Sequence, residues 1–129
     1  MPSLALVVDD SMLMRYTVCR FLEEHGYTVE SATNGVEAME VLTRIKPDLI
    51  VTDMQMPKMS GDKLISALKA KPETAAVPII IVAARASGFD ESENRANFTI
   101  YKDIDIEKQL AKALAALSRK RRRGHAAGK

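Results

Sequence analysis

Short runs of consecutive apolar residues recur along the chain, separated by longer segments in which apolar residues return every three or four positions. A run that is apolar throughout is typical of a strand buried on both faces of a parallel sheet. Shorter stretches rich in β-branched and aromatic residues also favour strands. The pattern predicts five strands, at residues 4–8, 27–32, 49–52, 78–84 and 98–101.

Helical spacing dominates between these strands. We expect the first helix to begin at Ser11 and to end near Gly26, and the second to be capped by Asn34 and to continue until Pro47. A third helix precedes Pro72, and a last helix carries the apolar stripe Ile106, Leu110, Ala113, Leu114 and Leu117. Residues 85–97 lack such periodicity, so a short or disordered fourth helix is expected there.

Strands that alternate with helices must pair in parallel through right-handed crossovers. The sequence therefore predicts an α/β fold with a single five-stranded parallel sheet, doubly wound and flavodoxin-like, in strand order 2-1-3-4-5. Ligands of such sheets bind at the carboxyl ends of the strands.

The composition fits one globular domain. The chain has 129 residues, 47% of them hydrophobic and 28% charged, and no apolar run approaches the ~20 residues that span a bilayer. The start of the chain lacks a basic secretion signal, and the lone Cys19 excludes an internal disulfide and a thiolate metal cluster. These features predict a cytoplasmic protein with one domain at residues 1–118, followed by a basic tail at 119–129.

Four ionisable residues end three of the predicted strands. Asp9 and Asp10 follow the first strand, Asp53 ends the third and Lys102 follows the fifth, so all four should meet at one edge of the sheet. Two carboxylates about 5 Å apart repel by roughly 3 kcal/mol at an effective dielectric of 20. A divalent cation or Lys102 must balance this charge, and an all-oxygen ligand set favours Mg²⁺.

These residues lie in segments that resemble the CheY-like receiver domain of response regulators in two-component systems, over residues 4–118. The resemblance rests on VVDDS at 7–11, DLIVTDMQMPKMSG at 48–61, VPIIIV at 77–82 and YK at 101–102. It implies that Asp53 accepts a phosphoryl group and that Lys102 contacts it. It also implies that Asp9, Asp10, Asp53 and the backbone carbonyl of Gln55 hold Mg²⁺.

The sequence departs from the family pattern at three switch positions. Ala83 stands where a Thr or Ser hydroxyl would bind a phosphoryl oxygen, a hydrogen bond worth ~1.5 to 3 kcal/mol. Thr99 replaces the aromatic residue that swings inward on activation, and Asp103 replaces the cis proline after the lysine. We therefore expect phosphorylation of Asp53 to be retained more fully than the conformational change by which phosphorylation alters the surface that binds a partner.

The basic tail is the other unusual feature. Residues 1–118 carry 13 basic and 17 acidic side chains, whereas 119–129 carry 6 basic and no acidic ones, five of them in the run Arg119, Lys120, Arg121, Arg122 and Arg123. Three interpretations remain open: a solvated helix end or linker, loose salt-sensitive contact with nucleic acid or anionic lipid, and a phosphate-bearing ligand. The last follows from a similarity to a minor group of CheY-like proteins that bind cyclic di-GMP.

The sequence predicts a stand-alone receiver that accepts phosphate from a histidine kinase or phosphotransfer protein and signals by binding a protein partner, without specific DNA binding. A pseudo-receiver that interacts independently of phosphorylation is the alternative, because of Ala83 and Thr99. An enzyme is not expected, because a phosphatase of the haloacid dehalogenase type needs a second acid two residues beyond its nucleophile, where this chain has Gln55.

Overall fold

The computed structural model describes residues 3–54, 56, 58–83, 97–102 and 105–127, the last nine of these through their backbone alone. Ten elements follow one another in these residues. They are β1 (Ser3–Val8), α1 (Met12–Glu24), β2 (Tyr27–Ala32), α2 (Gly35–Val41), β3 (Leu49–Asp53), α3 (Gly61–Ala70), α4 (Pro72–Ala75), β4 (Ile79–Ala83), β5 (Phe98–Tyr101) and α5 (Ile106–Ala127).

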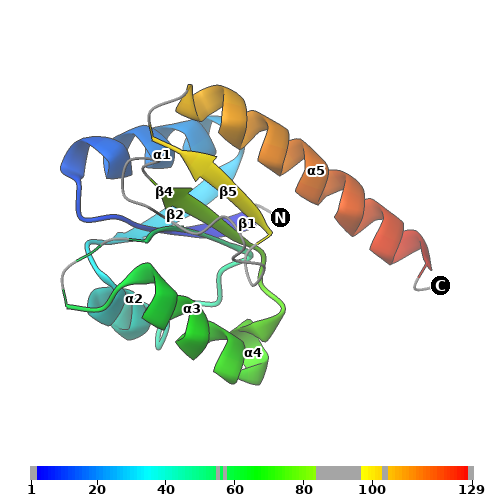
Figure 1. The fold of residues 1–129 in the computed structure, drawn as a ribbon. Helices are drawn as coiled ribbons and strands as arrows, with labels where there is room; N and C mark the ends of the chain where they lie inside the picture. Colours follow the sequence, from blue (N-terminus) through cyan, green and yellow to red (C-terminus); the bar gives the residue numbers. More distant parts are fainter. Residues whose placement is uncertain (1–2, 55, 57, 84–96, 103–104, 128–129) are drawn as a thin grey trace.

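The five strands form one parallel sheet in the order β2-β1-β3-β4-β5, which confirms the predicted topology. Helices α1 and α5 cover one face of the sheet, and α2 and α3 cover the other (Figure 1). Side chains of a strand alternate between faces. Ala5 and Val7 accordingly enter the core under α1 and α5, whereas Leu6 and Val8 enter the core under α2 and α3. The continuous apolar runs therefore reflect burial on both faces.

Local hydrogen bonds explain where the first two helices begin. The Ser11 hydroxyl accepts from the Met14 N–H at 3.3 Å and caps α1. The Asn34 side chain accepts from the Glu37 N–H at 2.9 Å, and the Glu37 carboxylate accepts in return from the Thr33 N–H at 2.9 Å. Both helix starts predicted from the sequence are confirmed.

The end of α2 and the segment after α3 differ from the prediction. Helix α2 stops at Val41 instead of continuing toward Pro47, because the next turns tighten: Thr43 N–H donates to Glu40 O and Arg44 N–H to Val41 O, each three residues back. Helix α3 ends before Pro72 as expected, but Pro72 then opens the four-residue helix α4, which was not predicted.

Helix α5 continues through the basic segment to Ala127. The predicted short or disordered helix at 85–97 lies outside the described residues except for Asn97, whose side chain and backbone both pair with Ile79. Across the described ranges, no helix has the length and apolar character needed to cross a membrane.

Candidate phosphoacceptor site

Strand register brings the predicted acids together. Val8 of β1 pairs with Thr52 of β3, so Asp9 and Asp53, each one residue further along, emerge at the same edge of the sheet. On the other side, Ala83 of β4 pairs with Tyr101 of β5, and the Lys102 N–H extends that ladder to Ala83 O at 3.0 Å. The carboxyl ends of the strands thus place acids and lysine next to one another.

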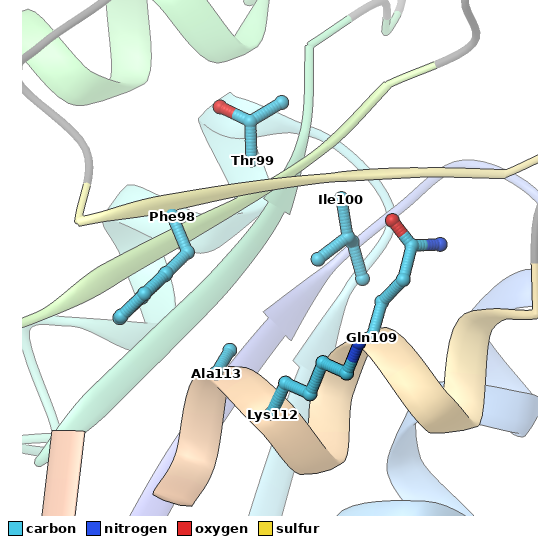
Figure 2. Close-up of a pocket in the computed structure, with 6 residues that line it drawn as sticks. All are labelled: Phe98, Thr99, Ile100, Gln109, Lys112 and Ala113. Atoms are coloured by element: carbon cyan, nitrogen blue, oxygen red, sulfur yellow. The ribbon is translucent and has the colours of Figure 1, made fainter. Parts of the chain in front are cut away.

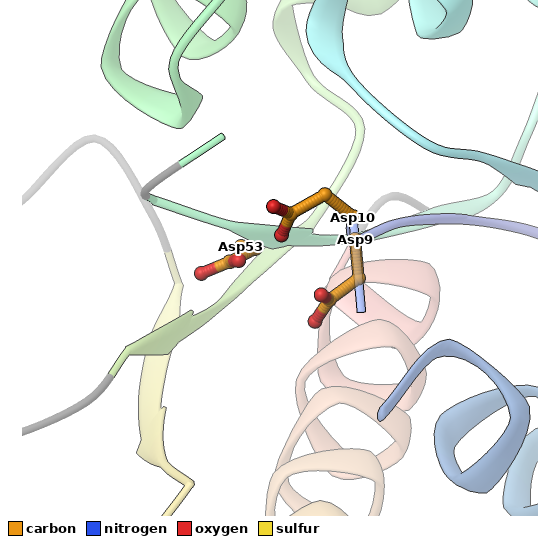
Figure 3. Close-up of side chains that lie close together, drawn as sticks. All are labelled: Asp9, Asp10 and Asp53. Carbon is orange, nitrogen blue, oxygen red and sulfur yellow. The ribbon is translucent and has the colours of Figure 1, made fainter. Parts of the chain in front are cut away.

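The three carboxylates form a compact cluster. One oxygen atom from each of Asp9, Asp10 and Asp53 lies within 4.8 Å of the others (Figure 3). Asp9 is 2% exposed and Asp53 is 4% exposed, whereas Asp10 is open to solvent. The cluster is therefore buried at its base and accessible at its rim.

Lys102 lies inside this cluster. Its Nζ is 3.1 Å from Asp53 Oδ2, a hydrogen bond and ion pair, and 3.8 Å from Asp9 Oδ2. At an effective dielectric of 20, each of these attractions is worth about 4 to 5 kcal/mol, comparable with a single repulsion between carboxylates at 4.8 Å. One ammonium group thus offsets only part of the mutual repulsion among three acids.

The pKa of Asp9 is raised in this excess of negative charge. This pKa is raised to about 6 from 3.8, mainly by burial and also by the nearby charge of Asp53, while Lys102 acts in the opposite direction. The strongest opposing influence is the Ser11 N–H, which donates to Asp9 Oδ1 at 2.9 Å. Additional positive charge at the site would favour the ionised form of Asp9.

The donor set fits Mg²⁺. All three cluster side chains offer carboxylate oxygens, the ligand type that hard divalent cations prefer, and one of them faces solvent, where metal-bound water can be accommodated. The fourth ligand expected from the sequence, the Gln55 carbonyl, lies outside the described residues.

Three supporting contacts were not predicted from the sequence. The Arg15 guanidinium donates to Asp9 O at 2.9 Å, and the Gln109 side chain of α5 pairs with both backbone groups of Tyr101, at 3.0 and 2.9 Å, directly before Lys102. Gly61 packs so closely on the Asp53 carbonyl that a Cβ atom would overlap it. The position of Arg15, one helical turn after the predicted cap Ser11, could have indicated its contact with the site. No local sequence pattern indicates the contact of Gln109 with Tyr101.

Two of the three switch positions, Ala83 and Thr99, lie among the described residues. Ala83 ends β4, is 2% exposed and presents a methyl group without a hydrogen-bonding atom. Thr99 is half-buried on β5 and points to the opposite side of the strand from Ile100 (Figure 2). Between β5 and α5 lies a groove of about 210 Å³, lined by Phe98, Thr99, Ile100, Gln109, Lys112 and Ala113. Asp103 lies outside the described residues.

Comparison with known proteins defines the class of this chain. The family model described as the response regulator receiver domain matches residues 5–115. The chain belongs to this family, whose members act as signalling modules that interact with histidine kinases or phosphotransfer proteins.

Among curated relatives, it is 34% identical over 125 residues to the response regulator MprA of Mycobacterium sp. (strain KMS), covering 92% of this chain and 52% of that protein. It is 31% identical over 120 residues to the DNA-binding dual master transcriptional regulator RpaA of Synechocystis sp., covering 88% of this chain and 48% of that protein. The chain thus spans about half the length of these relatives.

Solved structures agree with this assignment. The chemotaxis response regulator CheY4 of Vibrio cholerae has a TM-score of 0.79 at 27% identity, covering 90% of this chain and 98% of that one. The receiver domain of a signal transduction histidine kinase from Syntrophus aciditrophicus has a TM-score of 0.76 at 30% identity, covering 89% of both chains.

Proposed function

We propose that this chain is a cytoplasmic receiver, with its receiver domain at residues 1–118 and a basic segment at 119–129. It accepts a phosphoryl group on Asp53 from a histidine kinase or phosphotransfer protein and signals by binding a protein partner. The observation that carries the proposal is the position of Lys102 Nζ, 3.1 Å from Asp53 Oδ2 within a cluster of three carboxylates.

The proposed reaction moves one phosphoryl group. A carboxylate oxygen of Asp53 attacks the phosphorus of a phosphohistidine, a P–O bond forms and the P–N bond breaks. The imidazole leaves with the electron pair of that bond and takes up a proton. Negative charge gathers on the phosphoryl oxygens in such a transfer, so the protein contributes mainly by positioning and by neutralising charge. Lys102, on the side of β5, is placed to contact a phosphoryl oxygen.

Asp9, Asp10, Asp53 and the Gln55 carbonyl would hold Mg²⁺. When bound, the ion would add positive charge that neutralises the phosphoryl oxygens together with Lys102. The burial that raises the pKa of Asp9 supports this assignment, because a nearby cation would favour the ionised carboxylate.

A partner surface borders the pocket. Met12, Leu13 and Tyr16 on the first turns of α1 are 75%, 76% and 60% exposed, and α1 begins three residues after Asp9. Exposed apolar residues that adjoin one another mark sites of protein contact. They support a protein as the phosphodonor.

Intact mass spectrometry after incubation with acetyl phosphate and Mg²⁺ tests the phosphoacceptor. Wild type should gain one phosphoryl group, and Asp53→Asn none. Chelation of Mg²⁺ should also abolish the gain. Absence of any gain in wild type, over a range of donor concentrations and pH, would refute the proposal.

The α1 surface is tested with purified phosphorylated histidine kinases. Leu13→Ser should slow phosphoryl transfer from a protein donor at least tenfold and leave labelling by acetyl phosphate unchanged. Val36→Ser, at an exposed apolar residue of α2, is the matched control and should behave as wild type. Equal loss in both variants would contradict the assignment of α1.

A pseudo-receiver is the second candidate, favoured by the buried methyl group of Ala83. In this case the domain binds its partner in one conformation only. Affinity capture and calorimetry would then give the same partner affinity for wild type, Asp53→Asn and the acetyl phosphate-treated protein. An affinity change that depends on both Asp53 and the phosphodonor would exclude this candidate.

A further inference from the structure

Five of the seven Lys and Arg residues of α5 share one face of the helix, whereas Lys120 and Arg121 lie outside it. An α-helix turns through about 100° per residue, which places positions 108, 112, 119, 122 and 123 within an arc of about 100°. We call Lys108, Lys112, Arg119, Arg122 and Arg123 the basic stripe.

The apolar residues of α5 occupy the opposite face. Leu110, Ala113 and Leu117 are buried in the core under α1 and α5 and lie about 180° around the helix from the stripe. Lys108 and Lys112 are exposed, as this arrangement requires.

The stripe extends beyond the folded body. Its first and last members are 15 residues apart, which corresponds to about 22 Å at 1.5 Å per residue. Buried contacts of α5, within the residues whose side chains the structure describes, end at Leu117. From there the backbone of α5 continues away from the sheet to Ala127 (Figure 1). The stripe therefore begins on the domain surface and continues along the projecting helix.

Ordinary helix stabilisation does not explain this charge. The last acidic residue of the chain is Glu107, so from position 112 onward no position has an acid three or four residues away. Cations favour the C-terminal end of a helix, but the effect fades beyond the last turn, and Arg119 and Arg122 precede the last turn of α5. Within the stripe only Lys108 has an acid at this spacing, Asp105 three residues before it, and the other four residues have none.

The complementary partner is a polyanion with closely spaced charges. A nucleic acid duplex carries one phosphate charge per ~1.7 Å of its axis, and a row of cations about 22 Å long can engage several of them. A membrane-surface helix instead needs a free apolar face, and the apolar face of α5 is already buried in the core. Arginine, which supplies three of the five residues, also pairs with phosphate through two donors at once.

We propose that the basic stripe of α5 binds the phosphate backbone of nucleic acid, without sequence preference. The proposal is independent of phosphoryl transfer at Asp53. It requires Lys108 and Lys112, on the domain surface, to act together with the arginines of the projecting segment.

Fluorescence anisotropy with two labelled 20-base-pair duplexes of unrelated sequence tests it. Five phosphate contacts predict a slope of log K against log salt of about −4.5, a loss of roughly 500-fold in affinity between 50 and 200 mM KCl. Both duplexes should give the same result. Substituting all five stripe residues by Gln should abolish binding at 100 mM KCl.

Paired variants distinguish the stripe from an unstructured basic tail. Lys108→Gln with Lys112→Gln should weaken binding and reduce the slope to about −2.7, so that the loss over the same salt range is only about 40-fold. Lys46→Gln with Lys63→Gln removes the same charge from exposed sites elsewhere and should leave the slope unchanged. Circular dichroism confirms that each variant is folded.

Three results would overturn the proposal. In the first, wild type shows no salt-dependent binding to either duplex. In the second, the Lys108/Lys112 pair behaves like the control pair, which would leave binding to residues 119–123 alone. In the third, the chain binds vesicles of phosphatidylcholine and phosphatidylglycerol but not the duplexes, which would assign the stripe to anionic membranes.

Discussion

Replacing Asp9 by Asn should stabilise this protein at neutral pH when divalent cations are absent. The pKa of Asp9 is raised to about 6 in the folded state from 3.8, so the folded protein holds the proton more tightly than the unfolded chain does. Stability contributed by such a group is fully present below pH 4 and is lost as pH rises through 6.

The size of the effect follows from the two pKa values. Their difference corresponds to about 3 kcal/mol, and Asp9 is buried, so little of it is screened by solvent. Asn keeps an oxygen that can accept from the Ser11 N–H and removes the charge. At pH 7.5 in EDTA, the free energy of unfolding of Asp9→Asn should exceed that of wild type by about 3 kcal/mol, or roughly 10 °C in Tm.

Urea unfolding from pH 4.5 to 8 measures this difference directly. The advantage of Asp9→Asn should shrink to about 1 kcal/mol as pH falls to 4.5, and 10 mM Mg²⁺ should reduce it at pH 7.5 by stabilising wild type selectively. Glu30→Gln, which removes one exposed carboxylate from β2, is the control and should show neither trend. A variant no more stable than wild type at pH 7.5, or an advantage that does not depend on pH, would refute the reasoning.

Three further substitutions test the supports of the site. Gly61→Ala should lower the free energy of unfolding by about 1 to 3 kcal/mol and slow labelling of Asp53, because the new Cβ displaces the Asp53 carbonyl; unchanged labelling kinetics would contradict this. Gln109→Ala leaves both backbone groups of Tyr101 without their side-chain partner. It should lower the free energy of unfolding in urea by about 1 to 3 kcal/mol and slow the labelling of Asp53 by acetyl phosphate. A lower free energy of unfolding without slower labelling would mean that Gln109 does not position Lys102. Ala83→Thr adds a hydroxyl that can donate a hydrogen bond worth ~1.5 to 3 kcal/mol to a phosphoryl oxygen. This variant should show a larger change in amide hydrogen exchange on phosphorylation than wild type does. The same exchange pattern in both proteins would show that the missing hydroxyl does not limit the conformational change.

The sheet could be predicted from the sequence because its strands are buried on both faces. Such strands appear as continuous apolar runs, and the acids that end two of them mark where each run stops. Parallel pairing then forces Asp9 and Asp53 to the same edge. The parallel topology of the sheet is therefore sufficient to predict that these acids lie close to Lys102.

Other features depend on contacts that no local pattern encodes. Helix α2 ends at Val41 through turns that close on residues three back, although its apolar spacing continues to Ile45. Gln109 pairs with Tyr101 across the junction between β5 and α5, and a glutamine on a helix is ordinarily a solvated residue. The contact between Gln109 and Tyr101 joins two elements and becomes visible only when they are assembled, whereas α2 ends in local turns.

We propose that Asp53 is the phosphoacceptor of a pocket completed by Asp9, Asp10 and Lys102. Borohydride converts an aspartyl phosphate to homoserine, and peptide sequencing by mass spectrometry then locates the modified residue. After treatment with acetyl phosphate and Mg²⁺, homoserine should occur at position 53 alone. Homoserine at position 9 or 10, or at no position in a fully folded sample, would contradict the claim.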